Sequence, residues 1–139
     1  MIYLLLGSNL GDREGILKAA CGILEEELGV RLRCTAPRET AAVGFEGPDF
    51  LNLAVCFRRP GWLTPERLLE ICQSTEQKLG RPRHEAQYND DGSRKYVSRT
   101  IDIDILEFDD VRRCGEKLRL PHPQIESRPF VAPLLEELK

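Results

Sequence analysis

The chain has 139 residues, 41% of them hydrophobic and 31% charged, a balance typical of a soluble globular protein. This length predicts a single domain, residues 1–139, that is large enough to bury a real core. The net charge of −3 excludes a general electrostatic attraction to nucleic acid or to a membrane surface.

The cysteines and the N-terminus bear on the compartment. Five cysteines, an odd number, are scattered without a C-x-x-C pair. This pattern argues against a disulfide framework and a zinc site, and it favours a reducing compartment. The N-terminal stretch has no basic region and only a short apolar run, so it resembles neither a signal peptide nor a membrane span. We therefore expect a cytoplasmic protein.

The first elements are a buried strand and a helix. The continuous apolar run 2–6 predicts a central strand. Residues 7–12, GSNLGD, then turn the chain into a helix that Asp12 can cap and Gly29 can end. A glycine-rich turn from strand to helix could cradle a phosphate. The stretch matches neither a P-loop nor a dinucleotide-binding fingerprint, however, so a purely structural turn is the preferred interpretation.

Two further strands are expected at 30–36 and 50–58, with a loop of small residues over 40–48 between them. Asn52 shares a face of the third strand with apolar residues, where a polar amide needs partners. Those partners could be nearby backbone groups or a ligand, and the sequence favours neither.

The second helix has a strong start signal, with Thr64 as N-cap and Pro65 in the first turn, and it is expected to end at Gly80. Near its end, Gln73 and Glu76 lie three residues apart and so share a face. Arg81 and Arg83 follow. They could bind phosphate, or they could simply pair with the negative end of the helix dipole.

A polar segment, 84–98, comes next and contains turn residues and a basic end. It is expected to form a long mobile loop, and loops of this length in compact domains often act as lids.

The stretch 99–106, RTIDIDIL, alternates apolar and polar residues and predicts a strand. Asp102 and Asp104 then point to one face, about 6.5–7 Å apart along the strand. Like charges at this spacing repel each other, and a cation such as Mg²⁺ would relieve that repulsion. Together with Arg99 they suggest a phosphoryl-transfer site. The alternative is an acidic outer face of a half-exposed strand.

The C-terminal part is expected to be extended over 118–123, then helical near Gln124 and again over 130–138. His122 lies between two prolines and is rigidly presented, although a lone histidine is more often structural. The element order βαββα–loop–β–α predicts an α+β ferredoxin-like sandwich, with a mainly antiparallel sheet, helices on one face and the ligand site on the other.

Several collinear motifs make the chain resemble the 6-hydroxymethyl-7,8-dihydropterin pyrophosphokinase family. They are LGSNLGD (6–12), ETAAVG (39–44), PDFLN (48–52), Q-x-x-E (73–76), GRPR (80–83), SRTIDIDIL (98–106), LPHP (120–123) and RPF (128–130). Each motif is weak alone, but together they cover nearly the whole chain.

The resemblance implies transfer of pyrophosphate from ATP to the pterin hydroxymethyl group in folate biosynthesis, with release of AMP and use of two Mg²⁺ ions. It implies metal ligands at Asp102 and Asp104 and catalytic residues at Arg81 and Arg99, which would close over the site together with Tyr96. The implied ATP contacts are Gln73, Glu76, Arg81, Arg83, the backbone near Ile105, Lys117, His122 and Arg128. The implied pterin contacts are Thr40, Val43, Phe50, Asn52, Tyr96 and Phe130.

Two other hypotheses stay open at this point. Ferredoxin-like sheets commonly bind RNA on the open face, but here that face would carry two aspartates that repel phosphate. A homologue that keeps the site but has lost activity would serve as a binding protein instead. We expect small-molecule substrates, no nucleic-acid or membrane partner, and a monomer.

Overall fold

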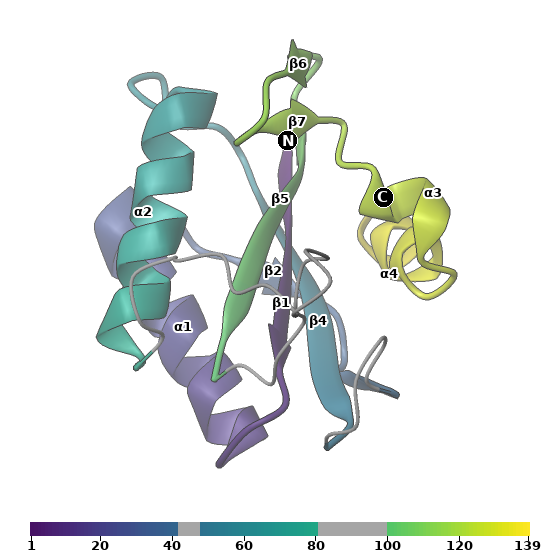
Figure 1. Cartoon of the computed structure of the whole chain (residues 1–139). Coiled ribbons are helices and arrows are strands. Elements are labelled where there is room, and N and C mark those ends of the chain that lie inside the picture. Colours follow the sequence, from purple (N-terminus) through teal and green to yellow (C-terminus); the bar gives the residue numbers. More distant parts are fainter. Residues whose placement is uncertain (42–47, 81–99) are drawn as a thin grey trace, which may run out of the picture.

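The computed structural model describes residues 1–41, 48–80 and 100–139 (Figure 1). Its main sheet has the strand order β2-β4-β1-β5, and β3 pairs with the other end of β4. The bounds are β1 Ile2–Ser8, β2 Arg33–Cys34, β3 Arg38–Thr40, β4 Phe50–Phe57 and β5 Asp102–Phe108. A separate hairpin joins β6 (Arg113–Cys114) to β7 (Arg119–Leu120), and the helices are α1 (Arg13–Leu28), α2 (Pro65–Lys78), α3 (Gln124–Ser127) and α4 (Val131–Leu138).

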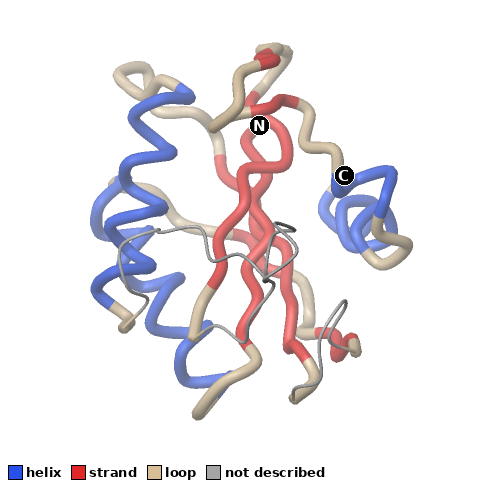
Figure 2. The backbone as a smooth tube through the Cα atoms, viewed as in Figure 1, coloured by secondary structure: helices blue, strands red, loops and turns tan. Residues whose placement is uncertain are grey.

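The sheet confirms the predicted α+β ferredoxin-like fold. β1 lies in the middle and runs antiparallel to both β4 and β5. Two β-α-β units, β1-α1-β2 and β4-α2-β5, therefore interleave with their helices on the same face of the sheet. Figure 2 shows this arrangement along the backbone, with the neighbouring strands β4, β1 and β5 side by side.

The predicted helix boundaries are confirmed by their caps. The Asp12 carboxylate accepts from the Gly15 backbone N–H at 3.2 Å, and Thr64 Oγ1 accepts from that of Arg67 at 3.1 Å. Gly29 ends α1 with φ of 65°, a left-handed conformation that glycine adopts without a steric penalty. Between these caps, both helices bury an apolar stripe against the sheet.

The second face of the sheet carries the C-terminal helices (Figure 1). Four α4 side chains, Val131, Leu134, Leu135 and Leu138, pack against Tyr3, Leu5, Ala54, Cys56 and Leu106. A register shift between Tyr3 and Leu4 lets both Leu106 and Glu107 face this side. The sequence predicted α4 but not its position, and α4 leaves only part of this face for a ligand.

The edge of the sheet differs from the sequence prediction. The expected strand 30–36 is reduced to Arg33–Cys34, which are in register with Cys56 and Val55 of β4. Part of the expected loop is instead β3, whose Thr40 pairs with Phe50. The predicted mobile loop 84–98 lies outside the described residues. In the described part of the chain, no helix combines the length and apolarity that crossing a membrane requires.

Cys21 on α1 and Cys34 on the edge strand β2 form a contacting thiol pair. The hydrogen bond from the Cys21 thiol lowers the pKa of Cys34 to about 7 and raises the pKa of Cys21, while burial and Glu25 oppose the lowering at Cys34. Alkylation by iodoacetamide follows the thiolate. We therefore expect Cys34 to reach half its maximal rate near pH 7, and Cys21→Ala to slow it at least about tenfold at that pH.

The measurement is peptide mass spectrometry after timed alkylation between pH 5.5 and 9. Cys72, which is buried and whose pKa is raised by burial, serves as the internal control and should stay unmodified while the protein is folded. An unchanged Cys34 profile in Cys21→Ala would show that the thiol contact does not control this reactivity.

Candidate active site

The site is built on rows of residues that cross the sheet. In one row, Asn52 on β4 pairs with Gly7 on β1, and Gly7 pairs with Asp102 on β5. In the neighbouring row, Ala54, Leu5 and Asp104 are in register. Because residues two apart on a strand share a face, Asn52, Gly7, Asp102 and Asp104 all belong to the face opposite α1 and α2.

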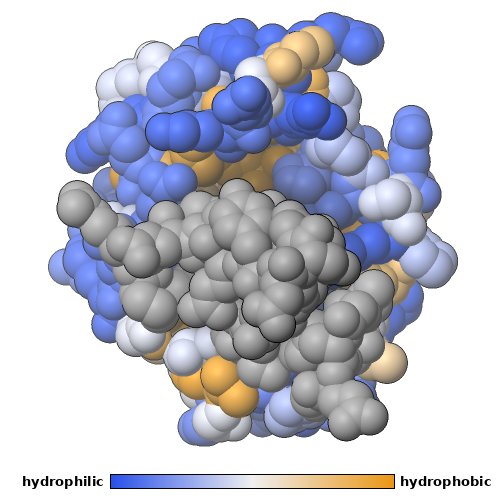
Figure 3. All heavy atoms as spheres, viewed as in Figure 1, coloured by the Kyte–Doolittle hydropathy of each residue, from blue (hydrophilic) through white to orange (hydrophobic). Residues whose placement is uncertain are grey.

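The alternation predicted for β5 is confirmed. Ile101, Ile103 and Ile105 are buried in the helix-side core, while Asp102 and Asp104 are half-buried on the other face. In the view of Figure 3, hydrophilic atoms cover most of the surface that is drawn in colour, and apolar atoms show in a recess between them. The two carboxylates are thus held by a rigid central strand.

The environment of Asp104 disfavours its charge. Burial, with Asp102 and Glu76 nearby, raises the pKa of Asp104 to about 8, although a hydrogen bond from Gln124 Nε2 to Asp104 Oδ2 at 3.0 Å acts against this rise. A carboxylate pair of this kind is stabilised in its ionised form by a cation. Within residues 1–41, 48–80 and 100–139, no three acidic, cysteine or histidine side chains converge as a preformed metal cage.

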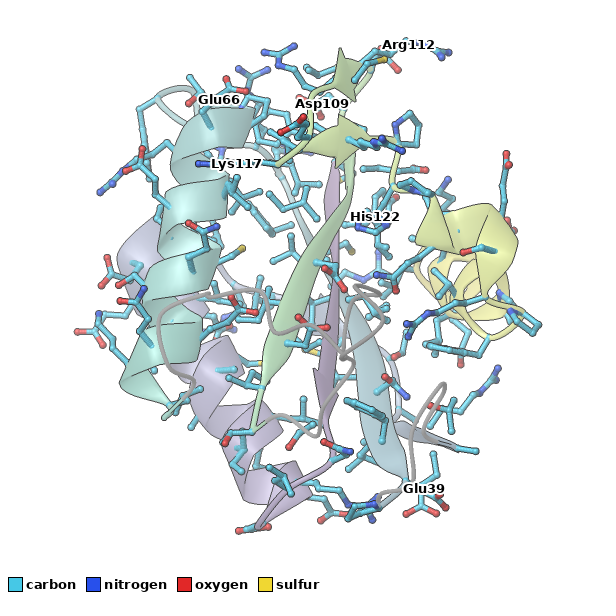
Figure 4. All side chains as sticks on the ribbon, in the orientation of Figure 1. Glu39, Glu66, Asp109, Arg112, Lys117 and His122 are labelled. Atoms are coloured by element: carbon cyan, nitrogen blue, oxygen red, sulfur yellow. The ribbon has the colours of Figure 1, made fainter. Side chains whose placement is uncertain are left out.

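His122 lies beside the aspartates, between β5 and α3 (Figure 4). Its backbone N–H donates to the Leu106 carbonyl at 2.9 Å, which attaches this segment to β5. Its Nδ1 accepts from the Gln124 backbone N–H at 3.1 Å, and its Nε2 lies 3.9 Å from Asp104 Oδ1. Burial lowers the pKa of His122, so the neutral ring presents an Nε2–H toward Asp104.

Gln73 and Glu76 are in different environments. Glu76 is buried, and its Oε2 accepts from the Ile103 backbone N–H at 2.9 Å, which ties α2 to β5. Gln73 is exposed. Although spacing puts them on neighbouring positions of α2, the structure gives Glu76 a tertiary role that the sequence did not reveal.

Asn52 is fixed by β3. Its Nδ2 donates to Thr40 Oγ1 at 2.8 Å and to the Arg38 carbonyl at 3.3 Å, and the residue is 4% exposed. The sequence allowed either nearby protein groups or a ligand as partners of this amide, and these bonds show that nearby protein groups satisfy its Nδ2. These bonds use Nδ2 alone, and Oδ1 points toward Gly7.

The absence of a side chain at Gly7 keeps the row open. A Cβ built there would lie 2.8 Å from Asn52 Oδ1 and 3.6 Å from the ring of Phe50. Phe50 is half-buried at the start of β4, and Thr40 pairs with it from β3. Asn52, Phe50 and Thr40 thus line one side of the space above Gly7.

The remaining predicted site residues are dispersed. Arg128 and Phe130, both half-buried, lie between α3 and α4, and Phe130 packs against the α4 cluster. Lys117 is exposed next to β7, on the α2 side of the sheet, away from His122 (Figure 4). Val43, Arg81, Arg83, Tyr96 and Arg99 lie outside the described residues.

Sequence reasoning missed two residues of this site. Gly7 was assigned to a turn, but β1 extends to Ser8 and places Gly7 in the row between Asn52 and Asp102. Gln124 was seen only as a helix start, yet it binds Asp104. The LGSN motif was a signal for the first. No sequence pattern pointed to the second.

Comparison with known proteins shows the family of this chain. The family model described as 7,8-dihydro-6-hydroxymethylpterin-pyrophosphokinase matches residues 3–139. A 2-amino-4-hydroxy-6-hydroxymethyldihydropteridine pyrophosphokinase from Porphyromonas gingivalis is 41% identical over 133 residues, covering 94% of this chain and 85% of the relative. The protein of the same name from Bacillus subtilis is 39% identical over 137 residues, covering 96% and 75%.

A folate synthesis bifunctional protein from Arabidopsis thaliana is 32% identical over 141 residues, which cover 99% of this chain but 27% of that longer protein. The match to the family model and the two bacterial relatives both extend over nearly the whole chain. The chain therefore belongs to the 7,8-dihydro-6-hydroxymethylpterin-pyrophosphokinase family.

Proposed function

We propose that this protein transfers pyrophosphate from ATP to the hydroxymethyl group of 6-hydroxymethyl-7,8-dihydropterin and releases AMP, as a step of folate biosynthesis. The observation that carries the proposal is the row Asn52–Gly7–Asp102. In this row, the space lined by the Asn52 amide and the Phe50 ring lies two strands away from the Asp102 and Asp104 carboxylates. Two strand spacings correspond to about 10 Å. A flat heterocycle with a hydroxymethyl arm fits that arrangement.

We assign the aspartates to two Mg²⁺ ions. The donor set fits, because Mg²⁺ prefers oxygen ligands, takes one or two carboxylates from a protein and completes its shell with phosphate and water. The raised pKa of Asp104 fits as well, because it marks a negative site that is under-compensated without a cation. When bound, the ions would neutralise the charge of the triphosphate during transfer.

The pterin would be held by its two faces and one edge. Phe50 and Phe130 are the aromatic candidates for the faces, since stacked π systems favour planar ligands. Asn52 Oδ1 can accept from a ring N–H, while its Nδ2 stays committed to β3. Thr40 and Val43 would complete this edge.

The nucleotide would lie toward α3, where Arg128 and the neutral Nε2–H of His122 can donate to phosphate oxygens. The other proposed ATP contacts are Gln73, Glu76, Arg81, Arg83, Lys117 and the Ile105 backbone. The residues that would close the site are Arg81, Arg99 and Tyr96. The bond between Glu76 and Ile103 makes Glu76 a support for β5 in this scheme. Catalysis then depends on alignment and charge neutralisation.

The deciding experiment measures the nucleotide product. The protein is mixed with ATP, Mg²⁺ and the pterin, and AMP and ADP are separated by chromatography. Pterin-dependent AMP in equimolar amount with pyrophosphorylated pterin is the expected result. ADP would mean ordinary phosphoryl transfer. If neither product forms while Mg²⁺-ATP still binds, the chain is a homologue that has lost the activity. We further propose a cytoplasmic monomer, which sedimentation can test.

A further inference from the structure

The side chain of Gln124 supports the aspartate pair from the first turn of α3. Its Nε2 donates to Asp104 Oδ2 at 3.0 Å, and its backbone N–H donates to His122 Nδ1 at 3.1 Å. One residue therefore sets the position of a carboxylate and the tautomer of the neighbouring imidazole. Backbone hydrogen bonds hold Gln124 in place in turn. The His122 N–H donates to the Leu106 carbonyl at 2.9 Å, and the Arg128 N–H donates to the Gln124 carbonyl at 3.0 Å.

The amide oxygen of Gln124, Oε1, forms no hydrogen bond. It is buried and is the one buried side-chain N or O atom without a hydrogen-bond partner in the described part of the chain. Turning the amide over would aim this oxygen at an ionised Asp104, so the present orientation is the favourable one. A buried acceptor is normally satisfied, so Oε1 is available to a donor that is supplied from outside the described residues.

The position of Oε1 limits what that donor can be. It belongs to the planar amide whose Nε2 touches Asp104, so it lies next to the place where a cation would meet this carboxylate. A hydrated divalent cation carries water ligands, which are strong donors, and groups that bind such outer positions orient the primary ligands.

We propose that Gln124 is a positioning residue of the cation site. Its Nε2–H fixes Asp104, and its Oε1 accepts a hydrogen bond from the hydration shell of the bound cation. This inference rests on the proposed function, because the cation is the one that the proposed reaction uses. It adds a residue for which neither the sequence motifs nor the family resemblance assigned a role.

The test measures cation binding directly. Mn²⁺ is titrated into the full chain in the presence of α,β-methylene-ATP, and free Mn²⁺ is followed by electron paramagnetic resonance. Gln124→Met removes both amide heteroatoms and keeps the length of the side chain. We expect its Mn²⁺ affinity to fall by about 10–100-fold, as for other outer-shell partners. Binding of the analogue without metal should stay within about twofold of wild type, a split that a general folding defect would not give.

Ser127→Ala, an exposed position on the same helix, is the matched control and should bind Mn²⁺ like the wild type. Gln124→Leu removes the same atoms with another shape and replaces Gln124→Met if circular dichroism shows that the first variant is unfolded. Wild-type Mn²⁺ affinity in a folded Gln124 variant would overturn the inference and leave the proposed function intact. Absence of Mn²⁺ binding by the wild type itself would overturn both.

Discussion

The Asp104→Asn variant is expected to melt at a higher temperature than the wild type at pH 8.5 without divalent cations, and to lose about a thousandfold in pyrophosphoryl transfer. The pKa of an aspartate is about 3.9 in an unfolded chain, whereas burial and nearby carboxylates raise that of Asp104 to about 8. Folding therefore favours the protonated form. The stability that this preference gives is complete below about pH 4 and is lost as the pH rises through 8.

Asparagine has no charge to desolvate, and its carbonyl can still accept from Gln124 Nε2, so the variant escapes this loss. The loss of activity has a separate cause, since a bound metal contributes several kcal/mol to catalysis and about 1.4 kcal/mol corresponds to a tenfold rate change. The measurements are melting curves at pH 4.5 and pH 8.5, with and without Mg²⁺, and the rate of AMP formation. Mg²⁺ should raise the melting temperature of the wild type but not of the variant.

Glu107→Gln is the matched control for Asp104→Asn. It removes one negative charge from the same strand, at a side chain that pairs with Lys139 Nζ at 2.9 Å on the surface. We expect a small loss of stability, below about 1 kcal/mol, and unchanged turnover. A lower melting temperature for Asp104→Asn than for the wild type at pH 8.5 would show that the carboxylate of Asp104 is not a source of instability.

What the sequence predicted well depends on near neighbours. The caps Asp12 and Thr64 act within three residues, and both helix starts were placed correctly. The alternation of isoleucines and aspartates in β5 also predicted its two faces, because one face of a strand must enter the core. By contrast, β3 was missed because it is short and exists only through its pairing with β4.

The charged residues of the site could be predicted from the sequence, but the way in which its residues come together across the strands could not. The two aspartates share a strand and could be recognised together. Gly7 and Asn52 meet only because β1 and β4 pair in one register, and a one-residue shift would have turned Asn52 into the other face. The part of the second face that is left for a ligand also depends on where α4 packs, and its packing partners come from β1, β4 and β5. Long-range pairing of this kind has no signature within a short sequence window.

The Gly7→Ala variant is expected to lose about a hundredfold in kcat/KM for the pterin while it keeps its affinity for Mg²⁺-ATP. A Cβ at this position would lie 2.8 Å from Asn52 Oδ1, closer than such atoms approach, and 3.6 Å from the Phe50 ring. The amide is held by Thr40 and the Arg38 carbonyl, so it can move only by giving up those bonds. Overpacking of this kind costs about 1–3 kcal/mol. The new methyl would also fill part of the space proposed for the pterin.

Gly22→Ala tests whether such an effect is local. Gly22 lies on the exposed side of α1, where an added Cβ meets nothing within 4 Å. Alanine in a helix is more favourable than glycine by about 1 kcal/mol, so this variant should be slightly more stable and fully active.

Titrations of pterin and of Mg²⁺-ATP, followed separately by calorimetry, distinguish the possibilities for Gly7→Ala. Loss of pterin binding alone locates the pterin above Gly7, because the nucleotide would lie toward α3 on the far side of Asp104. Equal losses for both ligands would mean that the methyl disturbs β1 as a whole, and unchanged pterin binding would move the pterin away from this row.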